Sequence, residues 1–321
     1  METVATNFHF HDLHPAHEDL HAEVIAGLGQ PVKALSPKLF YDQRGSELFD
    51  AITRLPEYYP TRTEIALLER HGDEMAASLG NDSLLFEFGS GSDVKIRVLL
   101  GAVRPRAYAP IDISREQLRH AAATIADANP ALDVHAVCAD YSKPLALPEL
   151  CAAPRREAFF PGSSIGNFDP HEAQVFLARA ARLIGHGGCL LIGVDLKKDP
   201  ALLNAAYNDR AGVTAAFNLN LLTRINRELD GDFDVSAFRH HAFYNAEQGR
   251  IEMHLVATSP QRVQIDGHLF AFRAGETIHT ENSYKYSVEE FQALAAKAGF
   301  ASERVWQDDD ALFSVHCLRA R

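Results

Sequence analysis

Cysteine is scarce in this sequence. Only four cysteines occur among the 321 residues, and their spacings match neither a zinc site nor a redox pair. A chain of this length buries a large core without disulfide bonds, so we expect free thiols in a reducing, cytoplasmic environment. Cys138 and Cys189 lie in apolar runs, which predicts that both are buried as small hydrophobic residues.

The sequence also lacks a long apolar run and an excess of positive charge. No stretch approaches the roughly 18 apolar residues of a membrane span, and no basic and then apolar segment opens the chain. The 31 Lys and Arg residues against 43 Asp and Glu residues give a formal net charge of −12, which argues against nucleic acid as a partner. Since 46% of the residues are hydrophobic, the composition predicts a soluble globular protein, which we expect to be a monomer without membrane contact.

Histidine is concentrated at the N-terminus, at His9, His11, His14, His17 and His21. Three of these, His14, His17 and His21, would share one face of a helix and could then bind a metal ion. No cysteine or converging carboxylate pattern completes such a site. We therefore expect residues 1–21 to be a flexible, solvated terminus, and we assign no metal.

Between residues 64 and 195, short apolar strands alternate with helical patterns. Such alternation predicts a parallel, doubly wound sheet with helices on both faces. The expected strands are residues 84–88, 107–111, 134–138, 158–160 and 189–194. The expected helices are residues 64–78, 96–100, 115–128 and 172–184.

The alternation ends after the last of these strands. Helical patterns at residues 201–207 and 213–229 precede antiparallel strand patterns within residues 243–284, where Asp266-Gly267 predicts a hairpin turn. We expect this insert and the N-terminal region to form a second, α+β lobe over the strand ends of the first domain.

A final helix is expected at residues 288–298, followed by strands at residues 301–306 and 312–317. We expect the last strand to join the parallel sheet in the antiparallel direction. The predicted division is a cofactor domain of residues 63–195 and 286–321, a substrate lobe of residues 22–62 and 196–285, and the flexible terminus.

A glycine turn, Gly89-Ser90-Gly91, follows the first predicted strand. Glycine lets the backbone approach a ligand closely, and the N-terminus of a helix follows. The turn is not a dinucleotide fingerprint, because Val94 stands where the third glycine belongs, and it is not followed by the Gly-Lys-Ser/Thr of a P-loop. The turn alone therefore does not identify the cofactor.

Acids at the next two strand ends narrow the choice. Asp112 ends the second strand, where a carboxylate accepts hydrogen bonds from ribose hydroxyls, and Asp140 ends the third, where an acid or its neighbour can bind an adenine amino group. Each aspartate alone could be a helix cap. Together with the glycine turn they form the pattern of class I S-adenosylmethionine-dependent methyltransferases, with a Rossmann-like sheet. Lys95 is either a solvated helix residue or the partner of the cofactor's methionine carboxylate.

Several longer segments are more specific than this fold pattern. Tyr-Tyr-Pro-Thr-Arg-Thr-Glu occupies residues 58–64, and Gly-Val-Thr-Ala-Ala-Phe-Asn occupies residues 212–218. The chain also carries related segments at residues 38–50 and 162–167. From about residue 30 to the C-terminus, the sequence resembles the bacterial histidine N-alpha-methyltransferases of ergothioneine biosynthesis.

This resemblance implies three successive methyl transfers from S-adenosylmethionine to the alpha-amino group of L-histidine, through mono- and dimethylated intermediates, to give hercynine. The resemblance implies cofactor contacts for Gly89, Lys95, Asp112, Asp140 and Tyr141. To these we add Ser90 of the glycine turn and Gly162 at the end of the fourth strand. The resemblance also implies histidine-backbone contacts for Tyr58, Asn167 and Tyr207, and imidazole contacts for Glu281 and Ser283. Residues implied near the pocket are Met253, Tyr41 and Phe49.

Two other functions remain open at the level of sequence. One is an S-adenosylmethionine-dependent N-methyltransferase of another amino acid or small amine, for which Glu281 and Met253 are the discriminating positions. The other is a non-catalytic regulator that keeps the fold and binds the cofactor without turnover.

Overall fold

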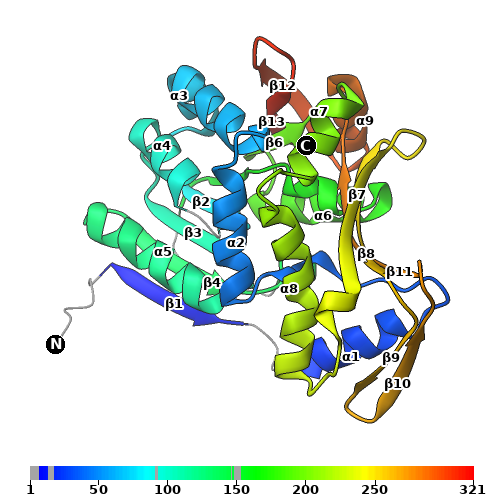
Figure 1. Cartoon of the computed structure of the whole chain (residues 1–321). Coiled ribbons are helices and arrows are strands. Elements are labelled where there is room, and N and C mark those ends of the chain that lie inside the picture. The colour runs from blue at the N-terminus through cyan, green and yellow to red at the C-terminus, as the bar shows by residue number, and fades with distance from the viewer. Residues whose placement is uncertain (1–6, 14–17, 91–92, 146, 148–152) are drawn as a thin grey trace. The chain divides into compact units, whose positions relative to one another are not determined.

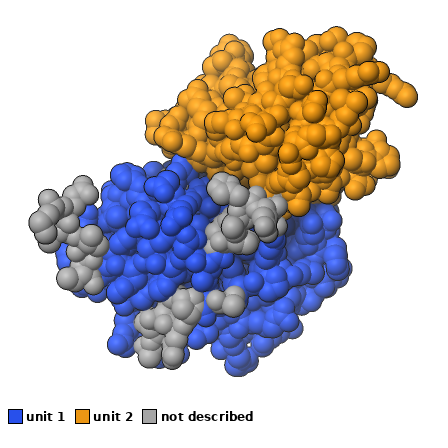
Figure 2. All heavy atoms as spheres, turned by 90° about the horizontal axis from the view of Figure 1, so that it is seen from below, with its two compact units in different colours: residues 1–14, 60–197, 285–321 blue, residues 15–59, 198–284 orange. Residues whose placement is uncertain are grey.

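The computed structural model describes residues 7–13, 18–90, 93–145, 147 and 153–321 (Figure 1). By their contacts the residues form two compact units (Figure 2). Unit 1 comprises residues 1–14, 60–197 and 285–321, and unit 2 comprises residues 15–59 and 198–284. Both units are therefore assembled from segments that are distant in the sequence.

Unit 1 is built on an eight-stranded sheet with the order β1-β4-β3-β2-β5-β6-β13-β12. Neighbouring strands from β1 to β6 are parallel, whereas β13 is antiparallel to both β6 and β12. This confirms the predicted fold class. The strands are β1 (Phe8–Asp12), β2 (Leu84–Phe88), β3 (Ala107–Asp112), β4 (Asp133–Cys138), β5 (Arg156–Phe160), β6 (Cys189–Asp195), β12 (Phe300–Gln307) and β13 (Phe313–Ala320).

The helices of unit 1 follow the predicted apolar periodicity. Two of them begin with capping boxes, in which Asp169 pairs with Glu172 and Ser287 pairs with Glu290. The helical segments are α3 (Tyr59–Leu79), α4 (Val94–Ala102), α5 (Arg115–Ala128), η2 (Ser164–Asn167), α6 (Pro170–Ile184) and α9 (Val288–Lys297). Helix α3 begins five residues before the predicted start, at Tyr59 rather than Glu64.

The core of unit 1 explains why its central strands read as continuous apolar runs. Every residue of β2 and β3 is buried, because helices cover both faces of the sheet there. The buried cluster includes Leu67 of α3, Leu85 of β2 and Trp306 of β12. Cys138 and Cys189 are buried, as predicted, whereas Cys151 lies outside the described residues.

The N-terminal segment corrects one expectation. Residues 8–12 are not flexible but form β1, which pairs in parallel with β4 along its whole length. Phe8 and Phe10 pack against the core of unit 1, and the Arg119 guanidinium of α5 lies over the Phe10 ring. The strand forms because Phe8 and Phe10 alternate with polar residues and face the core. The histidines between and after them led us to expect a solvated terminus. His14 and His17 lie outside the described residues.

Unit 2 contains a three-stranded antiparallel sheet with the order β11-β8-β7 and a separate β9–β10 hairpin. Its strands are β7 (Phe238–Asn245), β8 (Arg250–Ala257), β9 (Gln261–Ile265), β10 (His268–Phe272) and β11 (Thr277–Tyr284). Its helical segments are α1 (Glu18–Leu28), η1 (Pro37–Phe40), α2 (Gln43–Thr53), α7 (Pro200–Tyr207), α8 (Val213–Glu228) and η3 (Val235–Ala237). The predicted hairpin turn is confirmed, with positive φ at both Asp266 (43°) and Gly267 (78°).

The segment at residues 212–218 has a clear structural role at the start of α8. Both carboxylate oxygens of Asp209 accept backbone hydrogen bonds, from Val213 at 2.9 Å and from Thr214 at 2.8 Å. The fully buried Asn218 donates to the His254 carbonyl and accepts from the Thr280 hydroxyl. This part of the motif therefore fixes α8 against the three-stranded sheet.

Among the described residues, no helix has both the length and the apolar character that crossing a membrane requires.

Candidate functional site

The glycine turn follows β2 and lies next to Tyr141. Gly89 has a φ of 74°, a conformation that favours glycine. A β-carbon on Gly89 would lie 3.5 Å from the Tyr141 hydroxyl, so the tyrosine ring stands over the turn. Gly91 lies outside the described residues. Tyr141 therefore lies directly beside the backbone of the turn.

A buried polar group supports this turn from within the sheet. The Tyr108 hydroxyl donates a short hydrogen bond to Glu87 Oε2, and Ser90 Oγ lies 3.1 Å from the same hydroxyl. Burial raises the pKa of Glu87 to about 7. Sequence reasoning missed Glu87, although a lone acid in the apolar run Leu-Leu-Phe-Glu-Phe was a signal that it is paired inside the core.

The two predicted acids occupy the carboxyl ends of β3 and β4. Asp112 is 9% exposed and its Oδ1 accepts a hydrogen bond from the Ser114 backbone at 2.7 Å. Burial raises the pKa of Asp112 to about 6. Asp140 accepts from the backbone and hydroxyl of Ser142. Burial and the negative charges of Asp112 and Asp140 raise the pKa of Tyr141. Both carboxylates are therefore close enough to Tyr141 to act on its hydroxyl.

Lys95 is ion-paired inside unit 1. Its Nζ lies 2.6 Å from Oε2 of Glu64, a carboxylate with no exposed surface. The Gly162 backbone N–H donates to the same carboxylate, at 2.8 Å to Oε2 and 3.1 Å to Oε1. A β-carbon on Gly162 would lie 3.3 Å from Lys95 Nζ, and one on Gly193 would overlap Glu64 Oε1. Two glycines thus make room for this buried pair at the ends of β5 and β6.

Glu64 was missed as a site residue by sequence reasoning. It is the last residue of the unusual segment at residues 58–64, and its position there was the available signal. The pair with Lys95 joins α3 to α4, and the bonds from Gly162 join both helices to the loop after β5. Glu64 therefore positions the lysine and the glycine that the sequence assigned to the cofactor.

In unit 2 the predicted aromatic residues form a continuous series of ring contacts. The ring centroids of Tyr41 and Phe49 are 5.8 Å apart, those of Phe49 and Tyr58 are 6.5 Å apart, and those of Tyr58 and Tyr207 are 6.3 Å apart. All three pairs meet edge to face, the arrangement that aromatic quadrupoles favour. Residues from η1–α2, the start of α3 and the end of α7 are thereby brought together.

Polar residues continue this series onto the sheet of unit 2. The Tyr207 hydroxyl donates to Ser283 Oγ at 2.8 Å. Glu281 and Ser283 face the same side of β11, and Glu281 is the cross-strand partner of Met253. A register shift between His279 and Glu281 sets which side chains of β11 share this face. Seven of the eight predicted substrate residues thus form one contiguous group, while Asn167 ends η2 in unit 1.

Residues 20–320 match the family described as "Histidine-specific methyltransferase, SAM-dependent". The chain belongs to this family. Its methyl donor is S-adenosylmethionine. The match begins after β1, so the strand at residues 8–12 lies outside the region that the family describes.

Relatives with assigned names agree with this membership. The chain is 44% identical to a histidine N-alpha-methyltransferase of Mycolicibacterium smegmatis, over 94% of each chain. It is 42% identical to the protein of that name from Mycobacterium tuberculosis, over 93% of this chain and 94% of the relative. Ergothioneine biosynthesis protein 1 of Neurospora crassa is 32% identical over 85% of this chain, which corresponds to 32% of that longer protein.

Proposed function

We propose that this protein transfers three methyl groups in succession from S-adenosylmethionine to the alpha-amino nitrogen of L-histidine, yielding hercynine for ergothioneine biosynthesis. The observation that carries the proposal is the contiguous group in unit 2, in which Tyr207, Ser283 and Glu281 stand next to a series of aromatic rings. The family and the named relatives supply the substrate class.

The residues of unit 1 fit the methyl donor. Gly89 has no side chain and a positive φ, so its backbone can approach a ligand closely, and Tyr141 lies beside it. Asp112 is a carboxylate in a largely buried position, where hydrogen bonds from ribose hydroxyls stabilise its charged form. We assign the adenine end to Asp140 and Tyr141, and the methionine end to Lys95 and the Gly162 turn, with Ser90 holding the glycine turn.

The polar residues of unit 2 fit the histidine ring. A carboxylate such as Glu281 accepts a hydrogen bond from an imidazole N–H, and the Ser283 hydroxyl can serve the second ring nitrogen. Met253 is buried beside Glu281 in the cross-strand position and supplies an apolar, adaptable wall. We assign the amino acid backbone to Tyr58, Tyr207 and Asn167.

The chemistry asks for alignment and for a neutral amine. The methyl donor supplies an electrophilic carbon on a positively charged sulfur, and an in-line approach of the amine is then the main requirement. Tyrosine hydroxyls and the Asn167 amide can hold the substrate carboxylate without adding another full charge. Each transfer leaves more positive charge on the substrate nitrogen, which the faces of Tyr41, Phe49 and Tyr58 stabilise through cation–π attraction.

The direct test is turnover by the purified chain. L-histidine and S-adenosylmethionine are incubated with the protein, and products are followed by mass spectrometry over time. We expect masses for one, two and three added methyl groups, with the trimethylated species accumulating at the end. Absence of any methylated histidine, with cofactor binding intact, would overturn the proposal and favour either another amine substrate or a non-catalytic regulator.

A substitution at Glu281 tests the assignment of the substrate. Glu281→Gln keeps the size of the side chain but removes the charge that favours an imidazole N–H, so we expect the KM for histidine to rise by at least about tenfold. Glu247→Gln, on the exposed β7–β8 turn, is the matched control and should change nothing. An equal rise in KM for histidine, tryptophan and other amino acids would argue that Glu281 does not bind the imidazole ring.

A further inference from the structure

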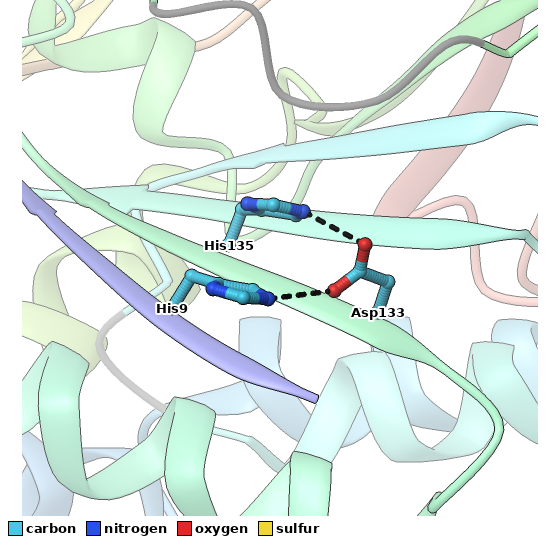
Figure 3. Close-up of side chains that lie close together, drawn as sticks. All are labelled: His9, Asp133 and His135. Atoms are coloured by element: carbon cyan, nitrogen blue, oxygen red, sulfur yellow. Dashed lines mark ion pairs between the residues drawn. The ribbon is translucent and has the colours of Figure 1, made fainter. Parts of the chain in front are cut away.

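Two histidines and an aspartate converge at the edge of the unit 1 sheet (Figure 3). His9 Nε2 lies 3.2 Å from Asp133 Oδ1, and His135 Nε2 lies 3.0 Å from Asp133 Oδ2. The family match begins after His9. None of the three residues belongs to the cofactor or substrate groups described above.

The pairing of β1 with β4 creates this convergence. His9 is the register partner of His135, and Asp133 is two residues before His135 on β4. Side chains alternate along a strand, so the three project from the same face, opposite to the face on which Phe8 and Phe10 pack. The register of β1 against β4 therefore creates the cluster.

The ligand set and the distances fit a transition-metal ion. Imidazole nitrogen and carboxylate oxygen bind zinc at about 2.0–2.2 Å, which places neighbouring ligand atoms about 3.3 Å apart in a tetrahedral site. Each histidine Nε2 lies near that distance from a different oxygen of Asp133, so the carboxylate would bind the ion through both of its oxygens. The imidazole rings are stacked at 4.6 Å with an interplanar angle of 16°, so one ring must tilt to point its lone pair at the same ion. His9 is 46% exposed and has room to do so, while His135 is only 8% exposed and fixed.

A fourth residue supports the buried histidine. His11 Nε2 lies 3.2 Å from His135 Nδ1. When His135 Nε2 binds a metal, its Nδ1 carries the hydrogen and can donate it to His11, which then orients the ring as outer-shell acceptors do for metal-bound histidines.

A second histidine cluster in unit 2 lacks this capacity. Glu252, His254 and His279 are also close together. However, Glu252 already accepts hydrogen bonds from the Arg250 guanidinium and from Asn245. A metal ion there would have to approach beside a fixed positive charge, which opposes binding.

We propose that His9, Asp133 and His135 form a binding site for a divalent transition-metal ion of the zinc class, with water completing the coordination. The site links β1, the N-terminal edge strand, to β4. A metal ion that binds only the folded chain stabilises it, so we expect the ion to stabilise the pairing of β1 with β4.

The test uses the full-length chain without an affinity tag, treated with chelator and then titrated with Zn²⁺ by calorimetry. We expect one ion per chain, and a visible spectrum typical of tetrahedral coordination when Co²⁺ replaces Zn²⁺. His9→Gln and Asp133→Asn should each weaken Zn²⁺ binding by at least about a hundredfold, and His11→Gln by about tenfold. His186→Gln and His21→Gln, elsewhere on the surface and in α1, are the matched controls and should bind as the parent does.

Thermal unfolding provides the second measurement, because His135→Gln removes a buried side chain and could impair folding by itself. Zn²⁺ should raise the melting temperature of the parent chain and of His186→Gln, but not that of the well-exposed His9→Gln. The proposal is overturned if His9→Gln and Asp133→Asn bind Zn²⁺ with unchanged affinity and stoichiometry, or if the parent shows only weak uptake at many sites.

Discussion

The buried ion pair between Glu64 and Lys95 offers the sharpest test of how unit 1 is held together. Glu64→Gln preserves the shape of the side chain and one acceptor for the Gly162 backbone, at 2.8 Å in the parent. It removes the charge that neutralises Lys95, whose ammonium is only 16% exposed. The Lys95 ammonium would then be a largely buried positive charge without a counter-ion.

The expected cost follows from that burial. Removing one partner of a fully buried pair costs about 3–5 kcal/mol. Since Lys95 keeps some access to water and glutamine keeps a hydrogen bond, we expect a loss at or just below the lower end of this range, about 2–3 kcal/mol. With a urea dependence of about 3 kcal/mol per molar, the unfolding midpoint of unit 1 should fall by nearly 1 M.

The single tryptophan of the chain makes this measurable for unit 1 alone. Trp306 is 4% exposed in the unit 1 core, so its fluorescence reports the unfolding of that core. The double variant Glu64→Gln with Lys95→Met should lose less stability than the sum of the two single variants, by at least about 1 kcal/mol. Glu69→Gln, exposed on the same helix, is the control. If Glu64→Gln unfolds at the same urea concentration as Glu69→Gln, or if the single losses simply add, the pair does not stabilise unit 1.

Three further predictions concern the pKa values and one turn. Burial raises the pKa of Asp112 to about 6, so the affinity for S-adenosylmethionine should fall as the pH drops below about 6. Asp112→Asn should bind the cofactor weakly at every pH. Calorimetry at low and neutral pH measures both affinities, and an affinity of the parent chain that does not change with pH would contradict the prediction. Glu87 has a folded-state pKa of about 7 against 4.5, so its contribution to stability is complete below about pH 4.5 and is lost as the pH rises through 7. Between about pH 5 and 8, the free energy of unfolding should therefore fall by about 2 kcal/mol less in Glu87→Gln than in the parent chain. Urea unfolding followed by Trp306 fluorescence measures this difference, and an equal fall in both chains would refute the prediction. Gly267→Ala, at a φ of 78°, should destabilise the β9–β10 hairpin by about 1 kcal/mol and lower the melting temperature by a few degrees, and a melting point equal to that of the parent would contradict it.

The sheet of unit 1 was predictable because its central strands are buried on both faces and are followed by a glycine or an acidic residue. Apolar runs such as Leu84–Phe88 stop at a glycine or an acid, and each stop marks the carboxyl end of a parallel strand. The strand β1 was not predictable in this way. Only Phe8 and Phe10 face the core, and they alternate with His9 and His11 in a histidine-rich segment that the sequence suggested was solvated.

The residues that support the site were harder to predict than those that form it. Glu64 and Glu87 are charged residues inside apolar surroundings, and their function depends on partners that are distant in the sequence, such as Lys95 and Tyr108. A pattern in one sequence reveals an acid at a strand end, because topology alone brings strand ends together. It does not reveal which buried acid meets which buried base.

The substrate group of unit 2 shows the limit of pattern more clearly. By alternation alone, Met253 is a core residue and Glu281 is an exposed one; in the structure Met253 is buried, whereas Glu281 is half-buried. Only the resemblance to a family joined them to Tyr58 and Tyr207, and the ring contacts and the Tyr207–Ser283 hydrogen bond now give that grouping a physical basis. Because this contact network lies wholly within unit 2, its geometry does not depend on the placement of unit 1. Variants in it should therefore change the response to histidine concentration, while variants at Asp112 or Lys95 should change the response to the methyl donor.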